Sequence, residues 1–293
     1  MVRAWIFGAV ALLSFVSRVE SASIDCTQCE TWNKDQAPFR IFGNTFYVGP
    51  RGLSSVLIAS PEGHVLIDGA LPQSAPMIAR NIEKLGFKLS DVKLVLSSHV
   101  HYDHVGGLAE LQKLTGAKVI ASDIAAPFLR SGKVDSTDPQ FELLPPPFPA
   151  VSNVEALGDR TSVAVGSFRV SVIHTPGHTR GGTSWRWRSC DESRCLNVVY
   201  GDSLTAVSDD AFKYGGDKRY PTAAADMRTS IDAIASTPCD ILIPAHPDMS
   251  GLWEVFDEQG NGDRAKFIDS AACKRYAAGA KTRLERRLKQ ERK

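Results

Sequence analysis

The segment His99-Val100-His101-Tyr102-Asp103-His104 places three histidines and one aspartate within six residues. It follows the apolar run 92–96, whose composition is typical of a β-strand. Neutral imidazole and carboxylate groups are ligands that suit a divalent metal such as zinc. A catalytic zinc ion takes three protein ligands and keeps one position open, so four donors exceed the needs of one ion. In an extended turn, His99 and His101 point to one side while Asp103 and His104 point to another, which predicts two metal ions.

Two further histidines follow strand-like runs elsewhere in the chain. His178 lies in a Pro-Gly turn after one such run, and His246 lies just after another. Strand ends that are distant in sequence can meet at one edge of a sheet pair, so we expect both histidines to join the cluster. His64 and His174 have no comparable context, and we interpret them as structural residues.

The pattern of apolar residues predicts an alternating arrangement of strands and helices. Short strands are expected at residues 46–48, 54–59, 64–68, 93–97, 118–121, 168–173, 183–188, 197–201 and 240–243. Helices are expected over residues 74–84, 107–114, 227–235 and 269–291. In the second of these helices, we expect Leu108, Leu111 and Leu114 to share the buried face. Such alternation is typical of a layered α/β domain.

The first 21 residues have the features of a secretory signal peptide. Arg3 precedes the apolar run 4–16, and small residues occupy positions 21–23. A membrane anchor is the alternative, but the run is shorter than the ~18–20 apolar residues that a spanning helix needs. We therefore expect a signal peptide over residues 1–21, with cleavage near 21–23, and a single domain over residues 24–293. The mature chain is expected to be periplasmic or secreted and free of the membrane.

The charge balance of the chain argues against a polyanionic partner. The full chain has a formal net charge of +1. Removal of residues 1–21 takes away two arginines and one glutamate, which leaves a net charge of zero. A neutral chain gives no electrostatic reason to expect nucleic acid as a partner.

The metal-ligand pattern resembles that of the metallo-β-lactamase superfamily. The residues that carry the likeness are the cluster 99–104, the tripeptide 177–179 and His246. From about Phe42 to Tyr276 the chain is most similar to the third subclass of class B β-lactamases, in the segments 43–49, 63–69, 114–119, 182–185, 202–206 and 238–240. The resemblance implies the metallo-β-lactamase fold, a four-layer αβ/βα sandwich. In this α/β fold, two mixed β-sheets carry outer helices, and a dinuclear metal site lies at one edge.

The resemblance also implies a set of metal ligands and a reaction. One zinc ion is held by His99, His101 and His178, and a second zinc ion by Asp103, His104 and His246. The implied reaction is hydrolysis of the β-lactam amide bond of penicillins, cephalosporins and carbapenems by a metal-bound hydroxide, which confers antibiotic resistance. Asp103 is expected to be catalytic as well as a ligand, because its carboxylate can orient the nucleophile.

Further side chains are candidates for binding the substrate, a small-molecule β-lactam. By resemblance, Ser203 and Thr205 lie beside the second metal and hold the substrate carboxylate through their hydroxyl groups. Gln140 and Phe141 belong to the proline-rich segment 131–152, a long loop that is expected to flank the site. The structural alternatives are an ordinary Ser/Thr-rich turn and a surface loop packed on the domain. We expect the enzyme to be a monomer.

Two other functions remain open. A thioester, lactone or phosphodiester hydrolase can use the same dinuclear fold. Related hydrolases place an aspartate at the position of Asp202, where it bridges both metals. The second alternative is a non-catalytic zinc-binding export protein, but a protein that only binds zinc needs no open, two-metal edge with six complete ligands. The role of Asp202 therefore separates the two hydrolase hypotheses.

The six cysteines are expected to form three disulfides, because the chain appears to be exported. The pair Cys190–Cys195 brackets a turn between two strand-like runs, which predicts a hairpin closed by a disulfide. By resemblance, the pair Cys239–Cys273 joins the last metal-bearing strand to the C-terminal helix. The pair Cys26–Cys29 then remains. A redox or zinc role is the alternative for this Cys-x-x-Cys motif, although no second such motif completes a metal site.

Overall fold

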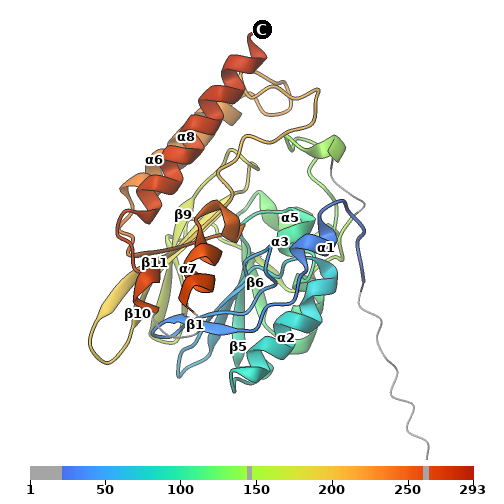
Figure 1. Ribbon diagram of the computed structural model, residues 1–293. Helices are drawn as coiled ribbons and strands as arrows, with labels where there is room; N and C mark the ends of the chain where they lie inside the picture. Colours follow the sequence, from blue (N-terminus) through green and yellow to red (C-terminus); the bar gives the residue numbers. More distant parts are fainter. Residues whose placement is uncertain (1–21, 144–146, 260–263) are drawn as a thin grey trace, which may run out of the picture.

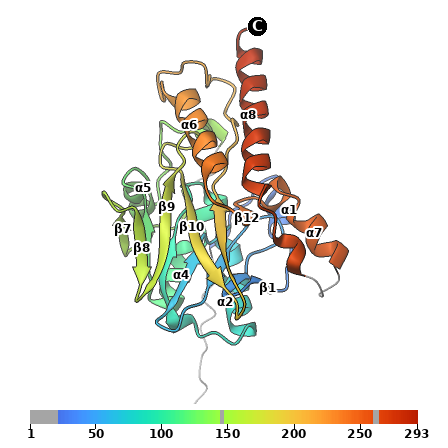
Figure 2. The same cartoon turned by 90° about the vertical axis from the view of Figure 1, so that its left-hand side faces the viewer.

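Two β-sheets pack face to face, and helices cover the outer face of each sheet (Figure 1, Figure 2). The computed structural model describes residues 22–143, 147–259 and 264–293. The expected signal peptide, residues 1–21, lies outside the described residues. Within the described ranges, no helix is both long enough and apolar enough to span a bilayer.

The first sheet has seven strands that follow one another in sequence order. They are β1 (Phe39–Phe42), β2 (Thr45–Tyr47), β3 (Val56–Ile58), β4 (His64–Ile67), β5 (Val92–Leu96), β6 (Lys118–Ala121) and β7 (Val154–Ala156). Neighbours from β1 to β4 are antiparallel, and neighbours from β4 to β7 are parallel. The outer face of this sheet packs against α2 (Ala75–Lys84), α4 (Leu108–Thr115) and α5 (Ala125–Ser131).

The second sheet has five strands in the order β12-β11-β10-β9-β8. They are β8 (Ser162–Val165), β9 (Phe168–His174), β10 (Thr183–Cys190), β11 (Cys195–Gly201) and β12 (Ile241–Pro244). All neighbours are antiparallel except β11 and β12, so this sheet is mixed as well. Its outer face is covered by α6 (Ala223–Ser236) and α8 (Ala272–Glu291), which lie side by side in Figure 1 and Figure 2. The short helix α7 (Leu252–Gln259) contributes to the core between the sheets.

Alternation along the strands divides the apolar side chains among three cores. In β4, Leu66 packs toward the outer helices, whereas Ile67 faces the other sheet. In β11, Val199 packs toward α6 and α8, whereas Tyr200 lies between the sheets. The split arises because successive side chains of a strand point to opposite faces. The expected four-layer αβ/βα sandwich is confirmed.

Most of the strands and the longest helices were predicted. All nine expected strands are present with ends within two residues, and the four expected helices correspond to α2, α4, α6 and α8. The strands β1, β7 and β8 were not predicted, nor were α1 (Cys29–Trp32), α3 (Tyr102–Val105), α5 and α7. A single helical turn such as α1 or α3 contains too few residues for a clear period.

The expectation that Leu114 shares the buried face of α4 is wrong, because this side chain is 41% exposed. A helix has about 3.6 residues per turn, so a strict spacing of three drifts around its axis. The buried face instead follows Leu108 and Leu111 with Gln112 and Thr115.

All six cysteines are paired in the structure, and the pairs are the three that the sequence suggested. The bonds are Cys26–Cys29, Cys190–Cys195 and Cys239–Cys273. The second closes the hairpin of β10 and β11. The third joins the residue pair with the largest separation, 34 positions, and ties the start of β12 to α8.

Removal of the Cys239–Cys273 bond is expected to destabilise the fold more than removal of either other bond. A cross-link lowers the entropy of the unfolded chain by an amount that grows with the logarithm of the length of the loop that it closes. The corresponding contribution to the free energy of unfolding is about 4 kcal/mol for this loop and about 2 kcal/mol for the Cys190–Cys195 loop. Urea unfolding of the two double-serine variants measures the difference. A smaller loss of unfolding free energy for the Cys239–Cys273 variant would contradict this prediction.

Candidate metal centre

The dense cluster 99–104 begins just beyond the end of β5. His101 has an extended backbone and immediately precedes α3, a single helical turn that carries Asp103 and His104. The expectation of an extended turn is therefore wrong beyond His101. The change from extended to helical backbone still places the ligand atoms of Asp103 and His104 in a separate group, although the rings of His99 and His104 lie 4.2 Å apart between centroids.

Two more strand ends complete the cluster. His178 lies in the turn between β9 and β10, and His246 follows β12. The structure assembles six side chains into two groups, within each of which the ligand atoms lie within 4.8 Å of one another. We call them the first group (His99, His101 and His178) and the second group (Asp103, His104 and His246). All six are buried except His246, which is partly exposed.

The second group has the spacing that a tetrahedral zinc ion requires. Asp103 Oδ2 lies 3.2 Å from His104 Nε2 and 3.4 Å from His246 Nε2. The two histidine nitrogens are 3.1 Å apart. Zinc bonds of about 2.0–2.1 Å in a tetrahedral arrangement separate ligand atoms by about 3.4 Å. The three side chains therefore fit a metal without rearrangement.

In the first group, a ligand atom without a hydrogen-bond partner indicates that this group also fits a metal ion. The ring of His99 is buried, and its Nδ1 interacts with Asp202 Oδ1 at 2.8 Å. Its Nε2 is buried and has no hydrogen-bond partner among the described residues. A buried nitrogen without a partner is costly, and ligation of a metal removes that cost. His101 is held in a similar way, with Nε2 at 3.0 Å from Asp138 Oδ2.

Two more of the histidines have partners behind their rings. His178 Nδ1 lies 2.9 Å from the carbonyl oxygen of Thr205 and 3.0 Å from its Oγ1. His104 Nδ1 lies 3.5 Å from Asp68 Oδ2. Carboxylate and carbonyl partners of this kind set the tautomer and orientation of metal-binding histidines.

Asp68 links the cluster to both sheets. It directly follows β4, and its φ of 56° lies in the left-handed region, which is unfavourable for a residue with a Cβ. Its carboxylate accepts hydrogen bonds from the backbone N–H of Ser98 at 2.7 Å and from the hydroxyl of Tyr200 at 2.8 Å. Sequence analysis did not identify Asp68 or Asp138. An aspartate directly after a buried strand is a signal that could have found Asp68, whereas Asp138 lies in an irregular loop.

Burial and charge set the protonation of the two groups differently. Burial and the neighbouring histidines hold the pKa of His99 well below its ordinary value, and burial lowers the pKa of His178 to about 3. Burial opposes ionisation of Asp103, but its histidine neighbours hold its pKa well below the usual range. Burial likewise opposes protonation of His104, yet Asp103 and Asp68 raise its pKa to about 10. His99 and His178 thus offer neutral imidazoles, and in the second group a metal must displace a proton from His104.

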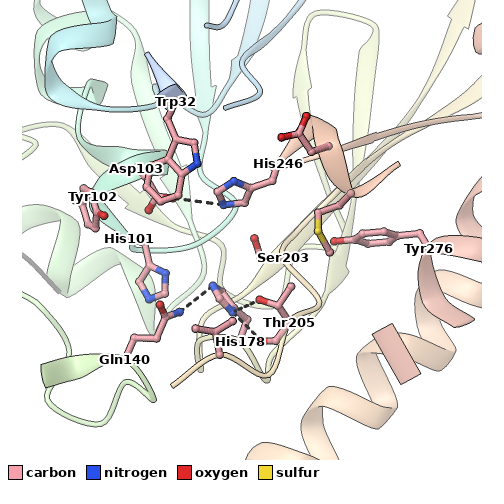
Figure 3. Close-up of a pocket in the computed structure, with 13 residues that line it drawn as sticks. Trp32, His101, Tyr102, Asp103, Gln140, His178, Ser203, Thr205, His246 and Tyr276 are labelled. Atoms are coloured by element: carbon pink, nitrogen blue, oxygen red, sulfur yellow. Dashed lines mark hydrogen bonds and ion pairs between the residues drawn. The ribbon is translucent and has the colours of Figure 1, made fainter. Parts of the chain in front are cut away.

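A cavity of about 370 Å³ opens over the two groups (Figure 3). The sides of this cavity, which we call the main cavity, include Trp32, Tyr102, Asp248, Met249 and Tyr276. The Trp32 ring packs 5.5 Å from the His246 ring, measured between centroids. None of these five residues was identified from the sequence as lining a site, although Tyr102 lies within the cluster 99–104 and Asp248 and Met249 closely follow His246.

The expected substrate-binding residues lie at this cavity, with one exception. Ser203, Thr205 and Gln140 all line it, and Gln140 Nε2 lies 3.3 Å from His178 Nε2 (Figure 3). Phe141 is not among the residues that line it, and this residue is 36% exposed. The hydroxyl of Thr205 is engaged with His178, whereas the buried hydroxyl of Ser203 has no hydrogen-bond partner in the described part of the chain.

Comparison with known proteins places this geometry in a family. The profile of the metallo-beta-lactamase superfamily matches residues 48–246, which include all six side chains of the two groups. The chain belongs to this superfamily. The solved structure of the Rm3 metallo-beta-lactamase is 51% identical, with a TM-score of 0.89, and the match covers 92% of this chain and 100% of that one.

Other relatives of this superfamily member include a metallo-beta-lactamase and a hydroxyacylglutathione hydrolase. MEM-A1, a subclass B3 metallo-beta-lactamase from a soil metagenome library, is 50% identical with a TM-score of 0.86, over 89% of this chain and 98% of that one. A hydroxyacylglutathione hydrolase of Rhodopseudomonas palustris (strain BisB5) is 32% identical over 151 residues, 52% of this chain and 48% of the relative. The chain spans about half the length of the curated relatives it matches. The expected resemblance to the third subclass of class B β-lactamases is confirmed.

Proposed function

We propose that this superfamily member is a zinc-dependent β-lactamase that hydrolyses the amide bond of penicillins, cephalosporins and carbapenems. The observation that carries the proposal is the presence of two complete ligand groups beneath one cavity. The extensive match to MEM-A1, a subclass B3 metallo-beta-lactamase, supports β-lactams as the substrates. Two zinc ions per chain are proposed, one for each group.

Each of the two groups would bind one metal ion. The first group would hold one zinc ion through three neutral imidazoles, and the second group would hold another through two imidazoles and one carboxylate. Bound zinc supplies an activated water at neutral pH and polarises a carbonyl oxygen. The acidic partners Asp68, Asp138 and Asp202 would keep the histidine rings in place during turnover.

Four side chains of the cavity have proposed roles in positioning the water, the substrate or a metal ligand. Asp103 directs Oδ2 at His104 and His246, which leaves Oδ1 to accept a hydrogen bond from the attacking water and orient it. Ser203 would donate its otherwise unpaired hydroxyl to the substrate carboxylate. Thr205 would act mainly by positioning His178, and Gln140 would contact substrate above the same ring.

We also propose that the enzyme works outside the cytoplasm. Residues 1–21 would be a cleaved signal peptide, and residues 24–293 a single periplasmic or secreted domain. The three disulfides favour an oxidising compartment. The mature protein would act as a monomer, with no nucleic-acid or membrane partner.

Turnover is expected to proceed without a covalent acyl-serine intermediate, so inhibitors that acylate a serine should have no effect. The chain has one Ser-x-x-Lys spacing, Ser90 to Lys93, and both side chains are exposed at the start of β5, outside the main cavity. Mass spectrometry of the enzyme during turnover is the measurement. A mass increase equal to that of the opened β-lactam, located on a serine, would refute this mechanism.

Replacement of Asp202 with asparagine is expected to reduce β-lactam turnover by ~10–100-fold while both zinc ions stay bound at saturating metal. The reason is that Asp202 interacts with His99 Nδ1 and with the backbone N–H of Ser203, so it acts through these neighbours. The measurement is kcat and zinc content on the same sample. A zinc content near one per chain would mean that Asp202 bridges two metals, and it would favour the thioester or lactone alternative.

The substrate class itself is tested by a direct comparison of two substrates. Purified mature enzyme is assayed with a carbapenem and with a hydroxyacylglutathione thioester, since hydroxyacylglutathione hydrolases are among the curated relatives. We expect kcat/KM for the carbapenem to be the larger by ~100-fold or more. Each 1.4 kcal/mol of difference in transition-state binding changes the ratio of the two kcat/KM values tenfold. A preference for the thioester would overturn the proposed function.

A further inference from the structure

Two connecting segments meet at the ring of His178. We call them the 132–143 segment, which follows α5, and the 202–222 segment, which lies between β11 and α6. Gln140 Nε2 of the former lies 3.3 Å from His178 Nε2, and Thr205 Oγ1 of the latter lies 3.0 Å from His178 Nδ1 (Figure 3). The placement of the two segments relative to each other therefore decides what surrounds this ring.

A single aspartate ties the 132–143 segment to the first group. Asp138 Oδ2 lies 3.0 Å from His101 Nε2, and Asp138 Oδ1 accepts a hydrogen bond from the backbone N–H of Gln140 at 2.7 Å. The turn that begins at Asp138 thus sets the position of Gln140 as well as that of the His101 ring.

Asp209 of the 202–222 segment contacts this same turn. It is buried, and its backbone N–H donates a hydrogen bond to the carbonyl oxygen of Pro139 at 2.9 Å. Its Oδ2 lies 3.5 Å from the backbone nitrogen of Glu142. Because Pro139 lies between Asp138 and Gln140 in the sequence, these contacts join the two segments at the edge of the main cavity.

Arg219 neutralises the buried carboxylate of Asp209. Its Nη1 lies 2.9 Å from Oδ2 and its Nη2 lies 3.0 Å from Oδ1, which is a bidentate pair. The hydrogen bonds from Arg219 lower the pKa of Asp209 to about 2, so the carboxylate stays charged near neutral pH. The Arg219 guanidinium also lies over the Phe212 ring, 5.1 Å from its centroid, and the Phe212 backbone N–H donates to Asp209 Oδ1 at 2.8 Å. A buried carboxylate without such partners is costly, so Asp209 depends on Arg219 for its position.

We propose that the Asp209–Arg219 ion pair positions residues 138–142 as one wall of the main cavity, so that Gln140 is held where it contacts substrate. The inference rests on the proposed function, in which Gln140 contacts the β-lactam. Neither member of the pair is among the residues that line the main cavity, so the pair acts through Pro139 and its neighbours. The six side chains of the two groups come from other segments. Loss of the pair should therefore weaken substrate binding more than it slows the chemical step.

The first test separates KM from kcat in Arg219→Gln, with a carbapenem at saturating zinc. We expect KM to rise ~5–10-fold and kcat to stay within about threefold of the wild type, because the contact that is lost acts in substrate binding. Arg228→Gln is the matched control. It removes the same charge from an exposed ion pair with Glu285, which joins α6 to α8 away from both segments, and it should keep the KM of the wild type.

The second test measures amide hydrogen exchange without substrate, so it does not depend on hydrolysis. Peptides that cover residues 137–143 should exchange about tenfold faster in Arg219→Gln than in the wild type or Arg228→Gln, because the partner of Asp209 is lost. Arg219→Lys keeps the charge but not the planar fork, so it should recover part of the protection and part of the KM. This conservative variant also tests the proposal if Arg219→Gln changes the fold.

A double variant tests whether the pair acts through Gln140. In a Gln140→Ala background, Arg219→Gln should change KM by less than about twofold, because effects that share one contact do not add. An unchanged KM and unchanged exchange in Arg219→Gln, or a full additional effect in the Gln140→Ala background, would overturn the positioning role. Carbapenem hydrolysis by the wild type in the same experiment would leave the proposed function intact. Absence of hydrolysis by the wild type would instead refute the proposed function, and the exchange measurement would still decide whether the ion pair holds residues 138–142.

Discussion

Replacement of Asp103 with asparagine is expected to lower kcat for β-lactam hydrolysis by ~10³-fold or more. Loss of several kcal/mol of transition-state stabilisation corresponds to an effect of this size. Asp103 is the one carboxylate in the two groups, and it contacts both His104 and His246. Asparagine has nearly the same shape, but it cannot supply the negative charge that holds a cation in the second group.

The measurement is kcat with a carbapenem at saturating zinc. Asp138→Asn is the matched control, because it makes the same chemical change at a buried aspartate that interacts with His101 from outside the first group. Changes at such supporting residues typically cost ~10–100-fold. If Asp103→Asn loses no more activity than Asp138→Asn, the proposed catalytic role of Asp103 is wrong.

Replacement of His246 with alanine is expected to reduce the zinc content from two ions per chain to one and to lower turnover at least ~100-fold. The second group would keep only Asp103 and His104, which is fewer than the three protein ligands that a catalytic zinc ion uses. The first group does not include His246 and should keep its metal. Equilibrium dialysis against buffered zinc, followed by metal analysis, measures both sites.

His174→Ala is the control for this variant. His174 is an exposed histidine at the end of β9 and belongs to neither group, so its loss should leave both zinc ions bound. A His246→Ala protein that still binds two zinc ions with wild-type affinity would show that the second group is wrongly assigned.

The side chains of the two groups were predictable from the sequence because their signal is local. The cluster 99–104 concentrates four ligands next to one strand, and both His178 and His246 follow predicted strands. Positions just beyond the strands of these sheets meet at one edge, so a histidine that follows a strand in the sequence is predicted to lie at that edge. His64 and His174, which the sequence analysis interprets as structural residues, belong to neither group.

The supporting residues were harder to predict because their signal is purely spatial. Asp138 meets His101 across 37 positions, and Asp68 meets His104 across 36, with no repeated spacing that links them. Trp32 reaches the cavity from a four-residue helix that has too few residues for a periodic pattern. The face-to-face packing of the two sheets likewise depends on contacts between distant segments, and it was predicted only from the resemblance to a family.

The most direct test of the account is carbapenem hydrolysis by zinc-depleted enzyme while zinc is titrated back. We expect no turnover without metal and a rate of carbapenem hydrolysis that increases with zinc until two ions per chain are bound. The wild type should then show full activity, since both groups are complete. Substantial hydrolysis by the metal-free protein, or no hydrolysis at any zinc content, would contradict the central claim.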